Sequence, residues 1–178
     1  MRRPRTLAAG LLLGVAYLAL AGPIGGLSDH LAAALGVRAY WRLIHRVELA
    51  AALAWAPALV WLLWRARERL DALFPSLVAL ACATFAFNYW LMTSAVEPIH
   101  YPQYALLGLV LRAGAGLDLP AALAGFFFGA VDEYLQGFVG RTTDLADVEY
   151  NFVAVLWGVW LFHLIAAVRA GSARRRAE

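Results

Sequence analysis

The segment that decides the fold is LPAALAGFFFGAVDEYLQGF, at residues 119–138. Its first part is apolar, and about 20 residues in a helix cross the hydrocarbon core of a bilayer. Its second part places Asp132, Glu133 and Gln136 inside such a helix. Ionisable groups at that depth cost about 2.5–3.5 kcal/mol each and mark functional positions. The segment therefore predicts a membrane-spanning helix that carries a polar site.

Small residues recur every four positions along the same segment. Gly125, Gly129 and Gly137 follow this spacing, and Glu133 occupies the position between the last two. Stripes of this kind let a second helix approach closely. We therefore expect Glu133 to point into a bundle of helices rather than toward lipid.

The composition of the chain agrees with this prediction. The 178 residues are 63% hydrophobic and 15% charged, whereas about a quarter of the residues of a soluble domain are charged. The length suits one compact helical bundle rather than two domains, so we expect one integral membrane domain over residues 1–178 with membrane lipid as a partner. All 15 basic residues are arginine and lie beside apolar segments, which is typical of topology signals and not of nucleic-acid binding.

The other apolar segments complete the predicted fold, an all-α polytopic transmembrane helical bundle. They lie at residues 7–24, 47–64, 73–92, 99–111 and 148–168. The fourth of these is short for a crossing, so we expect about six spans, with five as the alternative count. Residues 25–46 are mixed and predict a loop with a short amphipathic helix near the interface. The first segment also fits a signal peptide, although the spans that follow favour a retained helix.

The arginines predict the orientation of the bundle. With six spans both termini lie on one side, and the positive-inside rule places that side in the cytoplasm. The arginines on the predicted inner side are Arg2, Arg3, Arg5, Arg65, Arg67, Arg69, Arg112, Arg169, Arg174, Arg175 and Arg176. Those on the predicted outer side are Arg38, Arg42, Arg46 and Arg141.

Two polar windows lie toward the predicted outer face. In the first, helical spacing stacks Glu97, either His100 or Tyr101, Tyr104 and Gly108 along one side of a helix. An interfacial cap with a belt of tyrosines would explain the same pattern. The window alone does not distinguish a functional site from an interfacial cap.

The second window begins with the acids of the opening segment. The polar residues that follow them are Arg141, Asp144, Asp147 and Asn151. Arg141 is the nearest cation and the expected partner for one carboxylate. One interpretation of these polar residues is a set of salt bridges and hydrogen bonds that only holds the last helices together. The other is a functional site, called here the working site. Crowded carboxylates raise each other's pKa, which favours the working site.

Together the two windows resemble the VanZ-like family of bacterial membrane proteins over about residues 85–165. The resemblance rests on Glu97, His100, Tyr101, Tyr104, the run at residues 105–108, Asp132, Glu133, Gln136, Arg141, Asp147, Val148 and Asn151. It implies a multi-pass protein of the bacterial cytoplasmic membrane and cell envelope. The namesake of the family is associated with low-level resistance to the glycopeptide teicoplanin, and the resemblance implies no particular reaction.

Three functions are therefore open. In the first, the chain handles a lipid-linked or phosphate-bearing envelope precursor at the outer face. His100 would act as a base or metal ligand, Asp132 and Glu133 would hold a cation or move a proton, and Arg141 would bind phosphate. The second is an architectural scaffold, and the third is a small proton-coupled transporter. The sequence indicates no particular metal, cofactor or oligomeric state, and enzymatic activity stays open.

Overall fold

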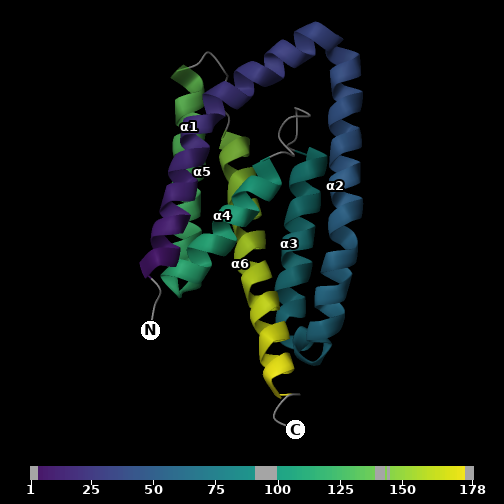
Figure 1. Cartoon of the computed structure of the whole chain (residues 1–178), viewed down its shortest axis with the longest axis vertical. Helices are drawn as coiled ribbons and strands as arrows, with labels where there is room; N and C mark the ends of the chain where they lie inside the picture. The colour runs from purple at the N-terminus through teal and green to yellow at the C-terminus, as the bar shows by residue number, and fades with distance from the viewer. Residues whose placement is uncertain (1–3, 91–99, 139–142, 144, 175–178) are drawn as a thin grey trace.

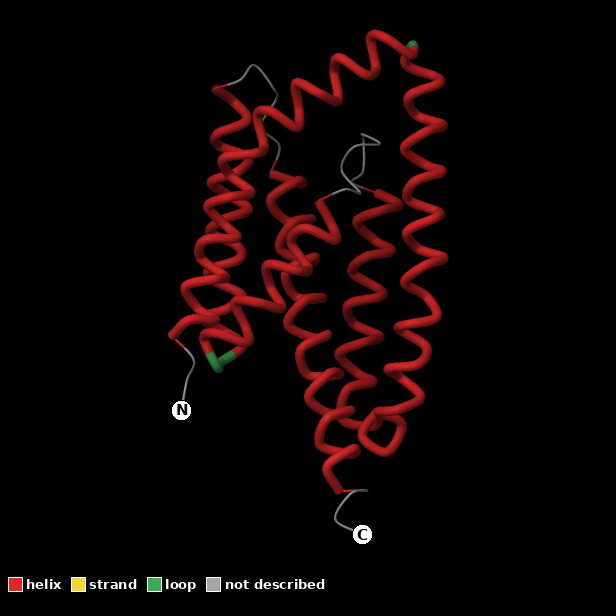
Figure 2. The backbone as a smooth tube through the Cα atoms, viewed as in Figure 1, coloured by secondary structure: helices red, strands yellow, loops and turns green. Residues whose placement is uncertain are grey.

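The computed structural model describes residues 4–90, 100–138, 143 and 145–174, and this part of the chain is helical almost throughout (Figure 1, Figure 2). No strand occurs among these residues, so the all-α prediction is confirmed. The helices are α1 (Pro4–Leu35), α2 (Val37–Ala66), the 3-10 helix η1 (Arg67–Arg69), α3 (Leu70–Trp90), α4 (His100–Ala115), α5 (Asp118–Phe138) and α6 (Leu145–Arg174). The six apolar segments predicted to be helical correspond to α1 to α6.

The prediction of a loop across residues 25–46 is wrong. α1 continues almost to α2, and only Gly36 lies between them. The φ of Gly36 is 78°, in the left-handed region that glycine adopts without steric cost. The polar residues of this stretch favoured a loop, but its leucines, alanines and arginines are good helix formers. The predicted amphipathic helix is present as the first turns of α2, where Tyr40 is buried while Arg38 and Arg42 are exposed.

Successive helices run in alternating directions, and the second half of α1 slants across one end of the bundle (Figure 1). α6 packs against α2, α3, α4 and α5, and α1 packs against α2, α4 and α5. The first turn of α1 and the last turn of α6 lie at the same end, called here the proximal end (Figure 1). The distal end is the opposite one, where α2, α4 and α6 begin and α5 ends.

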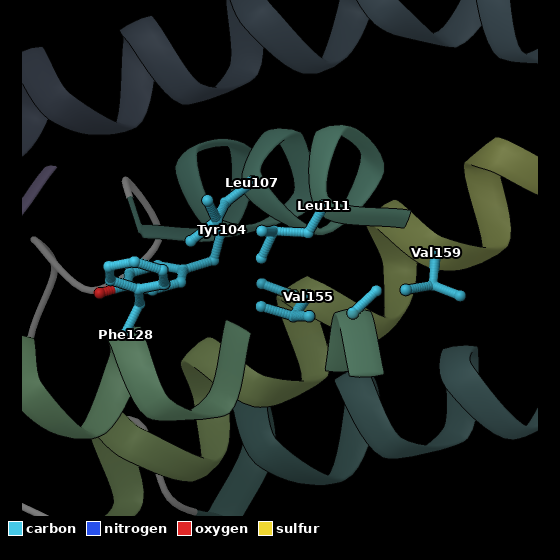
Figure 3. Close-up of a cluster of buried hydrophobic side chains, with 8 residues drawn as sticks. Tyr104, Leu107, Leu111, Phe128, Val155 and Val159 are labelled. Carbon is cyan, nitrogen blue, oxygen red and sulfur yellow. The ribbon is translucent and has the colours of Figure 1, made fainter. Parts of the chain in front are cut away.

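The main core lies where α4, α5 and α6 meet (Figure 3). Leu107 and Leu111 on α4 are fully buried and pack with Val155 on α6 and Phe128 on α5. Tyr104 closes this core toward the distal end, with its ring beside Phe128 (Figure 3). The core therefore fixes the three helices on which most of the predicted polar residues lie.

α4 and α6 cross with their backbones in contact. A Cβ atom on Gly158 would collide with the backbone oxygen of Ala105, and one on Gly108 would collide with that of Val155. A backbone atom cannot turn aside as a flexible side chain can, so both positions require glycine. Gly125 on α5 likewise faces the side chain of Val155, as the four-residue spacing predicts.

Large apolar side chains cover much of the outside of the protein. On α2, Leu53, Trp55 and Val60 are 65%, 69% and 64% exposed, and soluble monomers rarely expose contiguous apolar surface of this kind. Two of the described stretches, Leu53–Ala86 and Leu145–Arg174, are long and apolar enough to cross a membrane, by length and composition. Both observations support a membrane protein.

Candidate functional site

Polar side chains are buried where α5 and α6 approach the distal end. Within the described part of the chain they are Asp132, Glu133 and Gln136 on α5 and Asn151 on α6, each at most 4% exposed. These four residues are called here the buried polar cluster. Burying such groups is unfavourable unless each finds a partner. The partners of each side chain therefore decide whether the cluster is structural or can bind a ligand.

Asp132 is bound by a tyrosine of another helix. The Tyr104 hydroxyl on α4 donates a 2.9 Å hydrogen bond to Oδ2 of Asp132 on α5. The tyrosine is 1% exposed, so the bond is shielded from competing water. The ring of Tyr17 on α1 lies 6.3 Å from the Tyr104 ring, centroid to centroid. This contact therefore links α1, α4 and α5.

Glu133 has a partner one helical turn away. Nε2 of Gln136 donates a 2.8 Å hydrogen bond to Oε1 of Glu133. Both side chains are buried on α5, and the bond lies within a single turn of that helix. This pair keeps the carboxyl of Glu133 inside the bundle, as the four-residue spacing predicts.

Asn151 is the exception in the cluster. It is 1% exposed, yet neither Nδ2 nor Oδ1 has a hydrogen-bond partner among the described residues. Gly129 on α5 faces it, since a Cβ added there would lie 3.2 Å from Cβ of Asn151 and 3.7 Å from the Tyr104 ring. An unsatisfied buried amide costs about 1–3 kcal/mol. Asn151 therefore presents an unused donor and acceptor at the junction of α4, α5 and α6.

The other residues of the predicted site lie outside this cluster. Glu97, Arg141 and Asp144 fall outside the described residues, as does the side chain of His100, whose backbone begins α4. The predicted ion pair of Arg141 with a carboxylate therefore stays a prediction. Asp147 is half-buried in the first turn of α6, where the helix dipole favours a negative charge.

A second polar junction, at Thr84 on α3, was not predicted from the sequence. Its hydroxyl oxygen accepts hydrogen bonds from Trp157 Nε1 on α6 at 2.7 Å and from the Tyr101 hydroxyl on α4 at 3.0 Å. The Tyr101 ring also packs edge-on against Tyr150, with centroids 4.4 Å apart. In the sequence, the only local indication of this junction is the Thr84 hydroxyl within an apolar run. This junction joins α3 to the helices of the buried polar cluster.

The chemistry available in the cluster is hydrogen bonding. Carboxylates accept hydrogen bonds, and the amide of Asn151 supplies two donors and an acceptor. Such a set suits hydroxyl or amide groups of a ligand. No group of three or more histidine, cysteine, aspartate or glutamate residues within the described ranges could hold a metal ion.

The fold and the cluster define a class: an all-helical protein with an apolar exterior and buried carboxyl and amide groups among its last three helices. Comparison with protein-family models, curated proteins and solved structures finds no match. Evidence for function therefore comes from the side chains themselves.

A separate ionic contact joins the same three helices at the proximal end. Arg112 on α4 pairs with Asp118, the first residue of α5, and Nε2 of His163 on α6 lies 2.9 Å from Oδ1 of that carboxylate. The Arg112 guanidinium also lies over the ring of Phe162, 4.6 Å from its centroid. Partial burial acts to raise the pKa of Asp118, but the hydrogen bonds from His163 and Arg112 outweigh it and hold this pKa below its ordinary value.

Acid should remove the stabilisation that Asp118 provides. Because its pKa is lowered in the folded protein, the contribution is present above the ordinary value of 3.8 and is lost as the pH falls through the lowered pKa. The side chain is 56% exposed, so solvent screening limits the effect to about 0.5 kcal/mol. The difference in unfolding temperature between the wild type and Asp118→Asn should be present at pH 6 and vanish in acid. An equal difference at both pH values would contradict this role.

Proposed function

We propose that the chain is a multi-pass protein of the bacterial cytoplasmic membrane, of the VanZ-like kind. Its buried polar cluster binds the hydroxyl- or amide-bearing part of a lipid-linked envelope precursor near the outer face. The bundle has six spans, with both termini in the cytoplasm. The activity proposed is binding and presentation of the precursor.

Helix lengths support the number of spans. Residues 119–138 of α5 form about 30 Å of helix at 1.5 Å per residue, which matches a hydrocarbon core of about 30 Å and leaves Asp118 outside it. The apolar stretch Leu53–Ala86 contains η1, where the chain reverses between α2 and α3 (Figure 1). That stretch therefore supports two crossings in opposite directions. α1 and α6 are longer than a crossing requires, and α4, with 16 residues, is the shortest.

The observation that carries the proposal is the amide of Asn151. A residue with only a structural role would be hydrogen-bonded within the protein, as Tyr104 and Gln136 are. Asn151 is as buried as these residues and has no partner among the described residues. A ligand that supplies both a donor and an acceptor would offset the cost of burying this amide. Sugar hydroxyls and peptide amides have that chemistry, and the lipid tail would lie along the apolar exterior.

The test compares lipid retention by the wild type and Asn151→Leu. Leucine has a similar size and needs no hydrogen bond, so we expect the unfolding temperature in detergent to stay equal or rise. Lipid-linked precursor that co-purifies from bacterial membranes, measured by mass spectrometry, should fall about tenfold, because two lost hydrogen bonds are worth about 1–3 kcal/mol and a tenfold change in affinity is about 1.4 kcal/mol. Ser172→Leu, near the proximal end of the same helix, is the matched control and should retain the precursor.

Either of two results would count against the proposal. A large fall in unfolding temperature for Asn151→Leu would mean that the amide holds helices together. If no precursor co-purified with the wild-type protein, a lipid-linked precursor would not be its ligand. Because stability and retention are measured on the same preparations, the two failures are distinguishable.

An architectural role is the second candidate, and the bond from Tyr104 to Asp132 favours it. This contact joins α4 and α5 through two buried side chains. It explains one carboxyl of the cluster and leaves the amide of Asn151 unexplained.

A further inference from the structure

The first turns of α2 carry three arginines at four-residue spacing. Arg38, Arg42 and Arg46 are all exposed, and this spacing places them along one side of a helix. They are called here the basic face. Two aromatic rings accompany them, since Trp41 and His45 lie with centroids 5.8 Å apart. The basic face lies at the distal end, the end at which α4 and α6 also begin (Figure 1).

The helix that carries the basic face is held in place by its other side. Tyr40 is 5% exposed, and the backbone N–H groups of Ala39 and Tyr40 both donate to the carbonyl of Gly36 at 3.0 Å. α2 is therefore formed from its first turn. The direction in which this turn presents its arginines is fixed by the buried tyrosine.

The three guanidinium groups have no hydrogen-bond or ion-pair partner among the described residues. By contrast, Arg112 at the proximal end is paired with Asp118. The basic face is thus not part of an internal salt-bridge network. Its charge is available to a partner outside the chain.

The length of α2 sets the depth of the basic face in a membrane. α2 has 30 residues, about 45 Å of helix, whereas the hydrocarbon core is about 30 Å thick. Residues 47–64 fill that core with about 27 Å of apolar helix. The preceding ten residues then extend about 15 Å through the headgroup layer. This step depends on the six-span placement made under the proposed function.

Positive charge is unexpected at the outer end of α2. Basic residues concentrate on the cytoplasmic side of membrane proteins, yet the basic face lies on the outer side of the proposed bundle. Guanidinium groups bind phosphate through paired hydrogen bonds, and phosphate is the anionic group present in the headgroup layer. We propose that the basic face binds the phosphate of anionic phospholipids in the outer leaflet.

The test uses the full-length protein with a photo-crosslinking residue, benzoylphenylalanine, in place of Trp41. The protein is reconstituted in vesicles of equal phosphatidylglycerol and phosphatidylcholine, and cross-linked lipids are identified by mass spectrometry. We expect phosphatidylglycerol to be captured about tenfold more than phosphatidylcholine, with the preference falling as salt is added. In Arg38→Gln/Arg42→Gln/Arg46→Gln the two lipids should be captured equally, with an unchanged unfolding temperature.

The control places the same crosslinker at Phe74, an exposed residue of α3 near the proximal end. The triple substitution should leave its lipid capture unchanged. Equal capture of both lipids at Trp41 in the otherwise wild-type chain would overturn the proposal and leave the six-span placement intact. Capture of no lipid there would overturn both. Loss of the preference on adding inorganic phosphate, with no such loss in sodium chloride of the same ionic strength, would show a site for the free anion and overturn a lipid headgroup as the occupant.

Discussion

Gly158→Ala should lower the unfolding temperature of the purified protein by about 10 °C. The added methyl group has no room, because it would collide with the backbone oxygen of Ala105 on α4. α4 and α6 would have to move apart along the main core. Overpacking of this kind costs about 3 kcal/mol, and a chain of this length loses a few degrees per kcal/mol. Size-exclusion chromatography after heating in detergent would measure the shift.

Two further glycine substitutions test the explanation. Gly108→Ala places its methyl group against the backbone oxygen of Val155, on the other side of the same crossing, and should behave similarly. Gly26→Ala is the matched control, because nothing lies within 4 Å of its added Cβ. Alanine is the better helix former, so this control should be neutral or slightly stabilising. Equal shifts for Gly26→Ala and Gly158→Ala would contradict the steric explanation.

The sequence predicted the helices well because their apolar runs are long and separated by clear breaks. The opening segment at residues 119–138 corresponds to α5, Asp118–Phe138, and the burial of Glu133 follows from its four-residue spacing with glycines. The error at residues 25–46 has a local cause. The charged residues there are typical of a loop, whereas Gly36 alone makes the turn by adopting a positive φ.

The contacts of the site could not be predicted in the same way. Trp157 and Thr84 are 73 residues apart in sequence, and nothing in either segment indicates that they meet. A tyrosine on α4 donates a hydrogen bond to Asp132 on α5, and nothing in either segment of the sequence indicates this contact. Helical periodicity shows which side of a helix a residue occupies, and the neighbour on that side depends on packing between helices.

Tyr104→Phe should destabilise the protein and leave precursor binding intact. The substitution removes only the hydroxyl that donates to Oδ2 of Asp132, while the ring stays packed beside Phe128. Loss of one buried hydrogen bond of this type costs about 1–3 kcal/mol, since Oδ2 of Asp132 loses the hydrogen bond from this tyrosine. A double-mutant cycle with Asp132→Asn should give a coupling energy of about 1 kcal/mol, because the two residues act through one contact. Thermal unfolding of the four proteins in detergent measures this coupling.

Tyr104→Phe and Asn151→Leu should therefore have opposite effects, although Gly129 lies next to both side chains. The first variant should unfold at a lower temperature and retain the lipid-linked precursor. The second should unfold no earlier and lose the precursor. If both variants instead lost stability without any change in retention, the buried polar cluster would be a structural lock throughout. If Tyr104→Phe lost the precursor at unchanged stability, its hydroxyl would belong to the binding site, and Asp132 would be oriented for the ligand by that bond.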